Sequence, residues 1–434
     1  MLGAIIGDIV GSKYEFNNIK TEDFPFFSEG CRFTDDTVMT AAVCMGVLNG
    51  LNEARKTAKT VESYMALYGG YYPEAGYGKR FDEWLKDRFR KPYGSFGNGS
   101  AMRVSSVAWI FESLEAVEKF AEVTAAVTHD HPEGIKGAKA VAGATFLARK
   151  GRSKEDIKLY LTRKYGYDLD KSIEEIRPYY TYDVSCQGSV PVALIAALES
   201  TGFEDAVRKA VSVGGDSDTI AAMAGAVAEG FYGIPEDIRN EALTYLDERI
   251  KEVLAKFEER LAKNKEDEER FEKACAFATE KHKGQMRAGG AEYISHPMEV
   301  AMRLKNALYP IEYAITGVFH DLLEDTDATE AEIEEIGGKE VLEAVKLVTK
   351  EPGYDMKSYI TRISANDMAR IVKGADRVHN LECSILRDYD FRDRYMWETK
   401  QWYLGIDEGT RLDTTVQDAF DELEEYNEIS DWDI

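Results

Sequence analysis

The chain has 434 residues, of which 44% are hydrophobic, and its 79 acidic against 54 basic side chains give a net charge of −25. This length allows two or three domains with sizeable cores, and the charge argues against broad binding to nucleic acid or to an anionic membrane. The sequence has no apolar run of about 18 residues, no basic start typical of a signal peptide and no CxxC pair among five scattered cysteines. We therefore expect a cytoplasmic protein with reduced thiols, without a membrane span or a zinc ribbon.

Helical patterns dominate the chain from its start to its end. Apolar residues recur at three- and four-residue steps in 38–48, 116–129, 134–150, 190–201 and 218–233. Residues 246–271 are dense in charge and lack Gly and Pro, and the helical pattern returns in 271–284, 296–308, 311–323 and 339–350. The sequence thus predicts an all-α protein of two helical domains, 1–245 and 268–434, joined by a charged helical linker, 246–267. The second domain ends in an acidic tail that the pattern does not place.

Two of the predicted helices begin with clustered acidic and hydroxyl side chains. The clusters are Thr34, Asp35 and Asp36 in the first helix and Asp216, Asp218 and Thr219 in the second. Either cluster alone is typical of an ordinary helix N-cap. If the two N-termini meet, however, four carboxylates converge and repel one another unless cations neutralise them. Oxygen ligands favour Mg²⁺, Mn²⁺ or Ca²⁺ over zinc, and four carboxylates suffice for a two-metal hydrolytic centre.

Several motifs in this half occur together and in one order. They are GAIIGDIVGSKYE, FTDDT, GNGSAMR, THDHPEGIKGA, CQGSVPVAL and GGDSDTIAAMAGA. Over roughly residues 1–240 this set resembles the ADP-ribosylglycohydrolase family. The resemblance implies an all-α domain that holds two Mg²⁺ or Mn²⁺ ions and releases ADP-ribose by cleaving the bond at ribose C1″.

The resemblance also assigns roles to particular residues. The implied metal ligands are Thr34, Asp35, Asp36, Asp216, Asp218 and Thr219. Glu15 and Asp35 are the implied catalytic carboxylates, with Glu15 as the acid/base of a glycosidic cleavage. The implied substrate contacts are Asn98, Gly99, Ser100, Met102 and His129. Without the resemblance, a Gly- and Ser-rich stretch is usually only a loop, and His129 reads equally well as a residue that fixes it.

A second group of metal-binding residue types lies in the other half of the chain. It comprises His296, the run His320, Asp321, Glu324 and Asp325, and the group Asp376, His379 and Asn380. A mixed nitrogen and oxygen set suits a divalent ion such as Mn²⁺ or Fe²⁺. Glu324 follows Asp321 at helical spacing, so it faces the same side of its helix. A buried His paired with one Asp is common, but three such segments together indicate a metal site.

The string HKGQMRAGGAEYISHPMEVA, FHDLLEDT and KGADRVHNL resembles the HD hydrolase domain of the RelA/SpoT family over roughly residues 268–385. The resemblance implies one Mn²⁺ on His296, His320, Asp321 and Asp376. It also implies that Glu324 and Asp325 orient the attacking water, and that Arg287 and Asn380 hold the nucleotide. That family removes the 3′-diphosphate from guanosine tetra- and pentaphosphate. Here Ala288 and Gly289 depart from its pattern, so another nucleotide 3′-phosphate or 3′-diphosphate is an alternative substrate.

These motifs together predict an enzyme with an ADP-ribosylated substrate in one half and a nucleotide substrate in the other. One alternative is a nucleotide-binding sensor, in which one half binds without turnover and regulates the other. Another is a hydrolase of ADP-ribosylated nucleic acid or of a small ADP-ribosyl metabolite. A purely structural protein would have no use for so many metal-ligand residues. The sequence does not indicate an oligomeric state.

Overall fold

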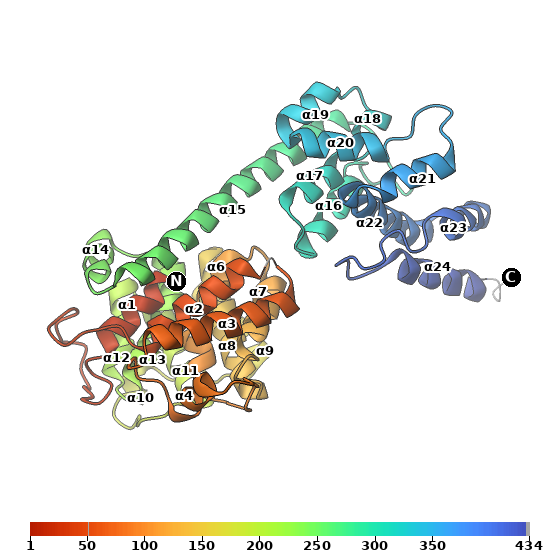
Figure 1. Cartoon of the computed structure of the whole chain (residues 1–434). Helices are drawn as coiled ribbons and strands as arrows, with labels where there is room; N and C mark the ends of the chain where they lie inside the picture. The colour runs from red at the N-terminus through yellow and green to blue at the C-terminus, as the bar shows by residue number, and fades with distance from the viewer. Residues whose placement is uncertain (51, 431–434) are drawn as a thin grey trace. The chain divides into compact units, whose positions relative to one another are not determined.

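A computed structural model describes residues 1–50 and 52–430, and it is helical throughout (Figure 1). Within these residues no β-strand forms, and only two isolated bridges occur, between Gly97 and Ser185 and between Met286 and Glu292. The chain divides into two compact units, Met1–Ala262 and Lys263–Ile434. The predicted all-α class with two helical domains is confirmed. None of the described helices is both long enough and apolar enough to cross a bilayer.

The first unit is a bundle whose central helix is α13. Its helices are α1 (Leu2–Gly11), α2 (Asp35–Asn49), α3 (Ala54–Tyr71), α4 (Lys79–Lys86), α5 (Gly99–Met102), α6 (Val107–Ile110), α7 (Leu114–Ala125), α8 (Pro132–Arg149), α9 (Lys154–Tyr165), α10 (Ile173–Ile176), α11 (Cys186–Glu199), α12 (Phe203–Ser212), α13 (Ser217–Tyr232) and α14 (Glu236–Thr244). Helix α13 is apolar on nearly all sides and packs against α1, α8, α11 and α12 (Figure 1). A helix of this kind belongs in a core, and its N-terminus is therefore held firmly inside the unit.

The closest approach in the first unit is between α1 and α13. Gly3, Gly7 and Gly11 recur every four residues, so they share one face of α1. A Cβ atom on Gly7 would lie 2.1 Å from the carbonyl oxygen of Ala221, and one on Gly11 would lie 2.4 Å from Cα of Asp218. Only glycine permits this backbone contact. The contact also brings the start of α13, which carries Asp218, next to the end of α1.

We predict that Gly7→Ala destabilises the protein by about 1–3 kcal/mol, because the new methyl group overlaps backbone that cannot move aside. Gly70→Ala is the matched control, since a Cβ atom there meets nothing within 4 Å in helix α3. That replacement should stabilise the helix by about 0.5–1 kcal/mol. Urea unfolding of both variants measures the two changes. If Gly7→Ala left the free energy of unfolding unchanged, the α1–α13 contact would be less tightly packed than the Cβ distances indicate.

Helix α15 (Glu248–Lys281) is a single helix that contributes to both units. In the first unit it buries Ile250, Val253 and Phe257. In the second unit it buries Phe271 and packs that side chain into an apolar cluster with α17 and α20. The predicted linker, 246–267, thus begins just before α15 and otherwise lies within it. Each end of α15 packs into the core of one unit.

The second unit is built around α22, which packs against most of its other helices. Its helices are α16 (Ser295–Asn306), α17 (Ile311–Phe319), α18 (Leu322–Asp325), α19 (Glu330–Gly337), α20 (Lys339–Val348), α21 (Met356–Ser364), α22 (Asp367–Ser384), α23 (Tyr389–Trp402) and α24 (Val416–Ser430). The acidic tail forms α24, which buries Val416, Phe420 and Leu423 against the core. Residues 431–434, the end of that tail, lie outside the described residues.

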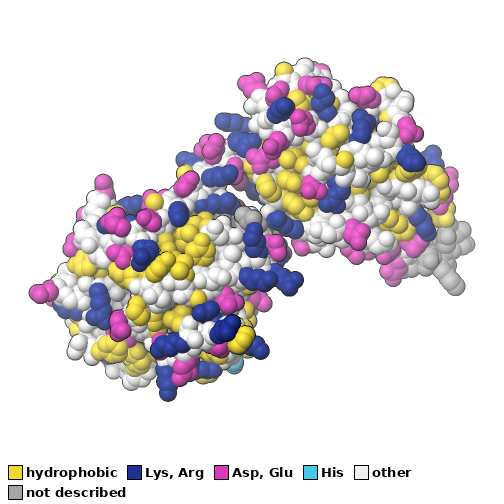
Figure 2. Space-filling view, viewed as in Figure 1, with side chains coloured by type: hydrophobic (Ala, Val, Ile, Leu, Met, Phe, Trp, Pro, Cys, Tyr) yellow, Lys and Arg dark blue, Asp and Glu magenta, His cyan; other side chains and the backbone are white. Residues whose placement is uncertain are grey.

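Charged side chains of both signs share the surface of the two units. On the face that Figure 2 shows, dark-blue Lys and Arg side chains are interspersed with magenta Asp and Glu. The view therefore presents mixed charge, with apolar patches between the charged groups, in each unit.

Candidate metal centres

The first centre begins with a buried acid on α1, Asp8, which the sequence analysis did not single out. Asp8 is fully buried and accepts hydrogen bonds from the backbone N–H groups of Thr34 (2.9 Å) and Thr37 (3.0 Å). It also accepts from the hydroxyls of Thr34 (2.7 Å) and Thr37 (2.5 Å). The two threonines thus satisfy Asp8 and fix the start of α2. Asp35 and Asp36, which lie between them, remain available for other partners.

The two predicted acidic clusters meet in space. The hydroxyl of Thr219, on α13, donates to Oδ2 of Asp36 at 3.1 Å. Glu15, Asp216 and Asp218 each offer a carboxylate oxygen within 4.8 Å of the others. Asp35 lines the same cavity. Four aspartates from two helix N-termini therefore converge, together with Glu15 from the loop after α1.

Burial and mutual repulsion disfavour the ionised forms of these acids. Burial, followed by the charge of neighbouring carboxylates, raises the pKa of Glu15 and of Asp35 to about 7. The same causes raise the pKa values of Asp36 and Asp218 well above the ordinary range. Oδ1 of Asp36 is buried and has no hydrogen-bond partner among the described residues. A cluster of hard oxygen donors with one unpartnered buried oxygen fits divalent cations such as Mg²⁺ or Mn²⁺.

The raised pKa values give a prediction for the metal-free chain. In the unfolded state Asp and Glu ionise near pH 4, whereas in the folded state Glu15 and Asp35 hold their protons up to about pH 7. The folded state thus binds more protons between these values, so the free energy of unfolding falls as pH rises from about 4 to 7. With a chelator present, we expect the melting temperature to drop by several degrees between pH 5 and pH 8.

Added Mg²⁺ should remove most of that drop, because the cation stabilises the ionised carboxylates. Asp36→Asn should also weaken the pH dependence, since it deletes one of the repelling charges. Thermal unfolding at both pH values, with and without Mg²⁺, measures these effects. A chelated wild-type chain that is more stable at pH 8 would contradict the electrostatic description of this cluster.

A cavity of about 360 Å³ opens from this acidic cluster. Of the predicted substrate contacts, Asn98, Gly99, Met102 and His129 line the cavity. Nδ2 of Asn98 donates to Oδ2 of Asp216 at 2.6 Å, so the glycine-rich loop is tied to the acidic cluster. Ser100 is not in the cavity wall, because its buried hydroxyl donates to the carbonyl of Gly134.

The wall of the cavity also carries cationic side chains, which the sequence analysis did not predict. Lys79, Arg80 and Arg103 line it. Arg103 is 2% exposed, and its Nη2 donates to the hydroxyl of Thr128 at 2.8 Å. In the part of the chain that the structure describes, its Nε has no hydrogen-bond partner. Burial lowers the pKa of Arg103 to about 10, so the side chain stays charged at neutral pH. A buried guanidinium without a carboxylate ion pair fits an anionic ligand.

The second centre brings the predicted histidines and aspartates together in the other unit. His296, His320 and Asp376 offer ligand atoms within 4.8 Å of one another. Nε2 of His296 lies 3.0 Å from Oδ1 of Asp376, and Nε2 of His320 lies 3.1 Å from Oδ2 of Asp321. The set therefore comprises two imidazole nitrogens and two carboxylates that face one point.

Hydrogen bonds orient both imidazole rings toward that point. Nδ1 of His320 lies 2.7 Å from the carbonyl of Gly317, so Nδ1 carries a hydrogen and Nε2 points toward Asp321 and Asp376. Nδ1 of His296 lies 2.7 Å from Nδ1 of His379 and can donate to it. Although burial lowers it, the charges of Asp321 and Asp376 raise the pKa of His320 to about 10. A site that attracts a proton this strongly, with mixed nitrogen and oxygen donors, fits a divalent cation such as Mn²⁺.

The surroundings of the second centre include two groups that the sequence analysis missed. Lys373 is an ion-pair partner of Asp376, with Nζ 2.7 Å from Oδ2. The hydroxyl of Tyr293 donates to Asp321 (2.7 Å) and to Asp325 (2.9 Å). Both groups fix the ligand carboxylates in place. Lys373 lies three residues before Asp376 on α22. This spacing brings two side chains together on a helix, so it could have indicated the contact from the sequence.

The centre opens into a cavity of about 300 Å³. Glu324 and Asp325, the predicted water-orienting pair, line it together with Arg287 and Asn380. Oε2 of Glu324 accepts a hydrogen bond from the backbone of Lys350 at 3.0 Å. All of the residues that the resemblance assigned to the second centre, except the buried His320, therefore line one space.

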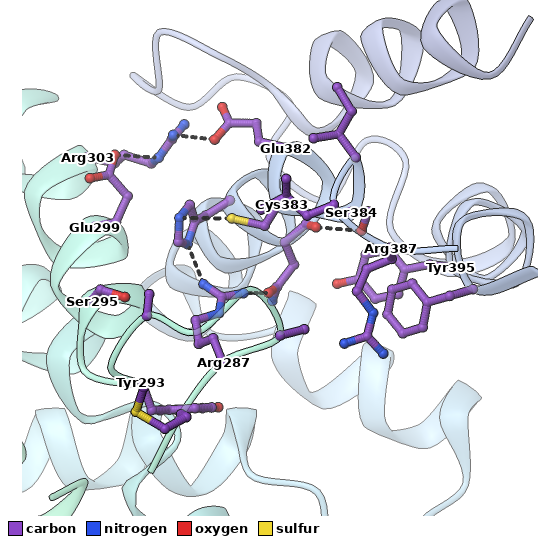
Figure 3. Close-up of a pocket in the computed structure, with 18 residues that line it drawn as sticks. Arg287, Tyr293, Ser295, Glu299, Arg303, Glu382, Cys383, Ser384, Arg387 and Tyr395 are labelled. Carbon is purple, nitrogen blue, oxygen red and sulfur yellow. Dashed lines mark hydrogen bonds and ion pairs between the residues drawn. The ribbon is translucent and has the colours of Figure 1, made fainter. Parts of the chain in front are cut away.

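A larger cavity of about 820 Å³ adjoins the 300 Å³ cavity of the second centre, since both are lined by Arg287, Tyr293, Asn380 and Tyr395. Figure 3 shows Arg287 in the wall of the larger cavity, where its Nη2 donates to Oδ1 of Asn380 at 3.0 Å. Arg303, ion-paired with Glu382 at 2.5 Å, and Arg387 also face this cavity. Apolar side chains, Met286, Ile385 and Leu386, complete its wall. A cavity that is partly cationic and partly apolar suits a ligand with both a ring system and phosphates.

Comparisons with known proteins agree with this division into two hydrolase-type units. The family model described as ADP-ribosylglycohydrolase matches residues 1–270, and the one described as HD domain matches residues 274–355. The chain belongs to the ADP-ribosylglycohydrolase family and carries an HD domain behind the family's domain. Both resemblances expected from the motifs are confirmed.

Individual relatives match one half each. The mouse ADP-ribosylhydrolase ARH3 is 27% identical over 54% of this chain and 83% of its own length. The guanosine-3′,5′-bis(diphosphate) 3′-pyrophosphohydrolase of Spiroplasma citri is 40% identical over 29% of this chain, which is 19% of the relative. A solved structure titled "ADP-ribosylglycohydrolase-related protein complex" shares 22% identity and covers 60% of this chain and 94% of its own, with a TM-score of 0.46.

Proposed function

We propose that the first unit hydrolyses the bond between C1″ of ADP-ribose and a protein side chain or small-molecule acceptor. The observation that carries this proposal is that one cavity is lined both by acidic side chains, such as Asp36 and Asp218, and by cationic side chains, such as Arg103. An ADP-ribosyl group has the matching polarity, because a ribose rich in hydroxyls lies next to a diphosphate. The distal ribose would lie at the acids and the diphosphate at the cations.

The residues divide the chemistry between them. The metal-holding groups would be Thr34, Asp35, Asp36, Asp216, Asp218 and Thr219, and two bound Mg²⁺ or Mn²⁺ ions would supply Lewis-acid activation of water. Glu15, with its pKa near 7, is suited to protonate the leaving group and then to accept a proton from water. Asn98 keeps the glycine-rich loop beside Asp216. Arg103 holds the diphosphate charge without losing its own proton.

We propose that the second unit hydrolyses a phosphate or diphosphate ester on a nucleotide, such as the 3′-diphosphate of guanosine tetraphosphate. His296, His320, Asp321 and Asp376 would hold one Mn²⁺, which supplies electrostatic activation of the phosphorus centre. Glu324 and Asp325 would orient the attacking water. Arg287 and Asn380, at the junction of the two cavities, would hold the nucleoside portion.

One experiment tests both proposals on the full-length protein. Purified chain is analysed for bound metal and then incubated with ADP-ribosylated peptide, ADP-ribosyl small molecules and guanosine tetraphosphate, with and without chelator. We expect free ADP-ribose from the first substrates and nucleotide products from the last, each abolished by chelation. Stable binding of these ligands without any product would instead favour the sensor alternative.

A further inference from the structure

Glu15 lies on a loop, and its carboxylate contacts the side chains of Tyr182 and Asp218. The loop follows α1, and the carboxylate is half-buried at the edge of the acidic cluster. The hydroxyl of Tyr182 donates to Oε1 of Glu15 at 3.4 Å, which is a long hydrogen bond. The position of this carboxylate relative to Asp216 and Asp218 therefore also depends on the contacts that hold the loop itself.

The side chain of Asn18 bridges the Glu15 loop to the start of α13. Its Nδ2 donates to the carbonyls of Tyr14 (2.8 Å) and Glu15 (2.8 Å) on the loop. The same nitrogen donates to the carbonyl of Gly215 at 3.0 Å, and Oδ1 accepts from the N–H of Gly215 at 2.8 Å. Both ends of one amide thus engage Gly215, the residue directly before Asp216.

The glycine turn before α13 has the shape that this bridge requires. Gly214 and Gly215 have φ values of +71° and +74°, which favour glycine. A Cβ atom on Gly214 would lie 3.2 Å from Oδ1 of Asn18. The turn therefore presents both backbone groups of Gly215 to Asn18 and leaves room for the amide.

Lys20 makes a second connection from the same loop. Its Nζ donates to the carbonyls of Tyr180 at 2.8 Å and Val213 at 2.5 Å. Val213 directly precedes the glycine turn, and Tyr180 lies two residues before Tyr182, which contacts Glu15. Two side chains of one short segment thus hold three backbone segments together around the acidic cluster.

We infer that Asn18 is a positioning residue that holds Glu15 at a fixed separation from Asp216 and Asp218, with Lys20 as its second anchor. The inference rests on the proposed hydrolysis of the C1″ bond, in which Glu15 exchanges a proton with the leaving group and the water. Because proton transfer needs Glu15 within hydrogen-bond reach of the reacting atoms, a loose loop slows the chemical step. Substrate binding, which depends on the rest of the cavity, changes little.

The test compares Asn18→Ala with Asn17→Ala in the full-length protein. Asn17 is the matched control, since it is adjacent, exposed and has no side-chain hydrogen bond to the described residues. For Asn18→Ala we expect kcat for ADP-ribose release to fall by about 10- to 100-fold with KM nearly unchanged. Hydrogen–deuterium exchange of residues 12–20 should become faster. Because Asn18 is itself exposed, the change opens no cavity in the core.

Two outcomes overturn the inference: unchanged exchange in residues 12–20, or faster exchange with unchanged kcat. Should Asn18→Ala fail to fold, Lys20→Met provides the same two readouts from the second anchor. A wild-type chain that releases no ADP-ribose defeats the proposed function alone. In that case the exchange rates of Asn18→Ala still decide whether this side chain holds the loop.

Discussion

Replacing Asp36 with asparagine should abolish ADP-ribose release, with a loss of about 100-fold or more, and leave nucleotide hydrolysis intact. Asp36 is 3% exposed, and its Oδ1 accepts no hydrogen bond from residues 1–50 and 52–430. Asparagine keeps the shape and the Thr219 contact to one oxygen, but it removes the negative charge that a hard cation requires. Even residues that only support metal ligands typically contribute 10- to 100-fold, so loss of a ligand should cost at least the upper value.

The control for Asp36→Asn is Asp237→Asn, which makes the same charge change on the exposed first turn of α14. It should leave both activities unaltered. Mass spectrometry under native conditions should show fewer bound divalent ions in Asp36→Asn and an unchanged number in the control. Two observations would count against the two-centre description: undiminished ADP-ribose release by Asp36→Asn, or loss of both activities together.

The sequence predicted the helices better than it predicted their ends. The apolar spacing of residues 218–233 corresponds closely to α13, Ser217–Tyr232. The pattern in 116–129 continues past the end of α7 at Ala125. Beyond that point Thr128 bonds to the His129 ring and accepts from Arg103. These are tertiary contacts, which the spacing of apolar residues does not encode.

The same limit explains which site residues were predicted and which were missed. Two helix starts with surplus acid and hydroxyl groups indicated convergence, because ordinary caps need one side chain. Asp8 was missed because it stands alone in an apolar helix, and its purpose appears only when Thr34 and Thr37 are seen to bond to it. Arg103 and Lys373 were missed because a charged residue in sequence usually faces solvent. Only packing shows that Arg103 is buried and that the side chain of Lys373 is 12% exposed.

The glycine-rich loop shows a different kind of limit. A stretch such as residues 97–100 offers several polar groups that face different directions. Asn98 turns toward the acidic cluster, whereas Ser100, two residues later, bonds to Gly134 and stabilises the loop. Motif resemblance identifies the loop as a whole, but the direction of each side chain depends on the helix that follows it.

Replacing Asp321 with asparagine should have the converse effect of the Asp36 change. Asp321 supplies the carboxylate nearest to Nε2 of His320, at 3.1 Å, and holds it with help from the hydroxyl of Tyr293. We expect nucleotide hydrolysis to fall by about 100-fold or more and one fewer Mn²⁺ to bind per chain, with ADP-ribose release unaffected. Tyr293→Phe removes only the supporting hydrogen bond and should cost about 10-fold.

The exposed acid Asp327, whose side chain is 90% exposed, provides the charge-matched control as Asp327→Asn and should keep full activity. We therefore expect nucleotide hydrolysis to decrease in the order Asp327→Asn, Tyr293→Phe, Asp321→Asn. This order follows because a ligand carries the cation directly, whereas a hydroxyl acts only through the ligand it orients. If Tyr293→Phe and Asp321→Asn were equally active, the carboxylate of Asp321 would not be holding the ion. If ADP-ribose release fell with Asp321→Asn, the two units would not act independently.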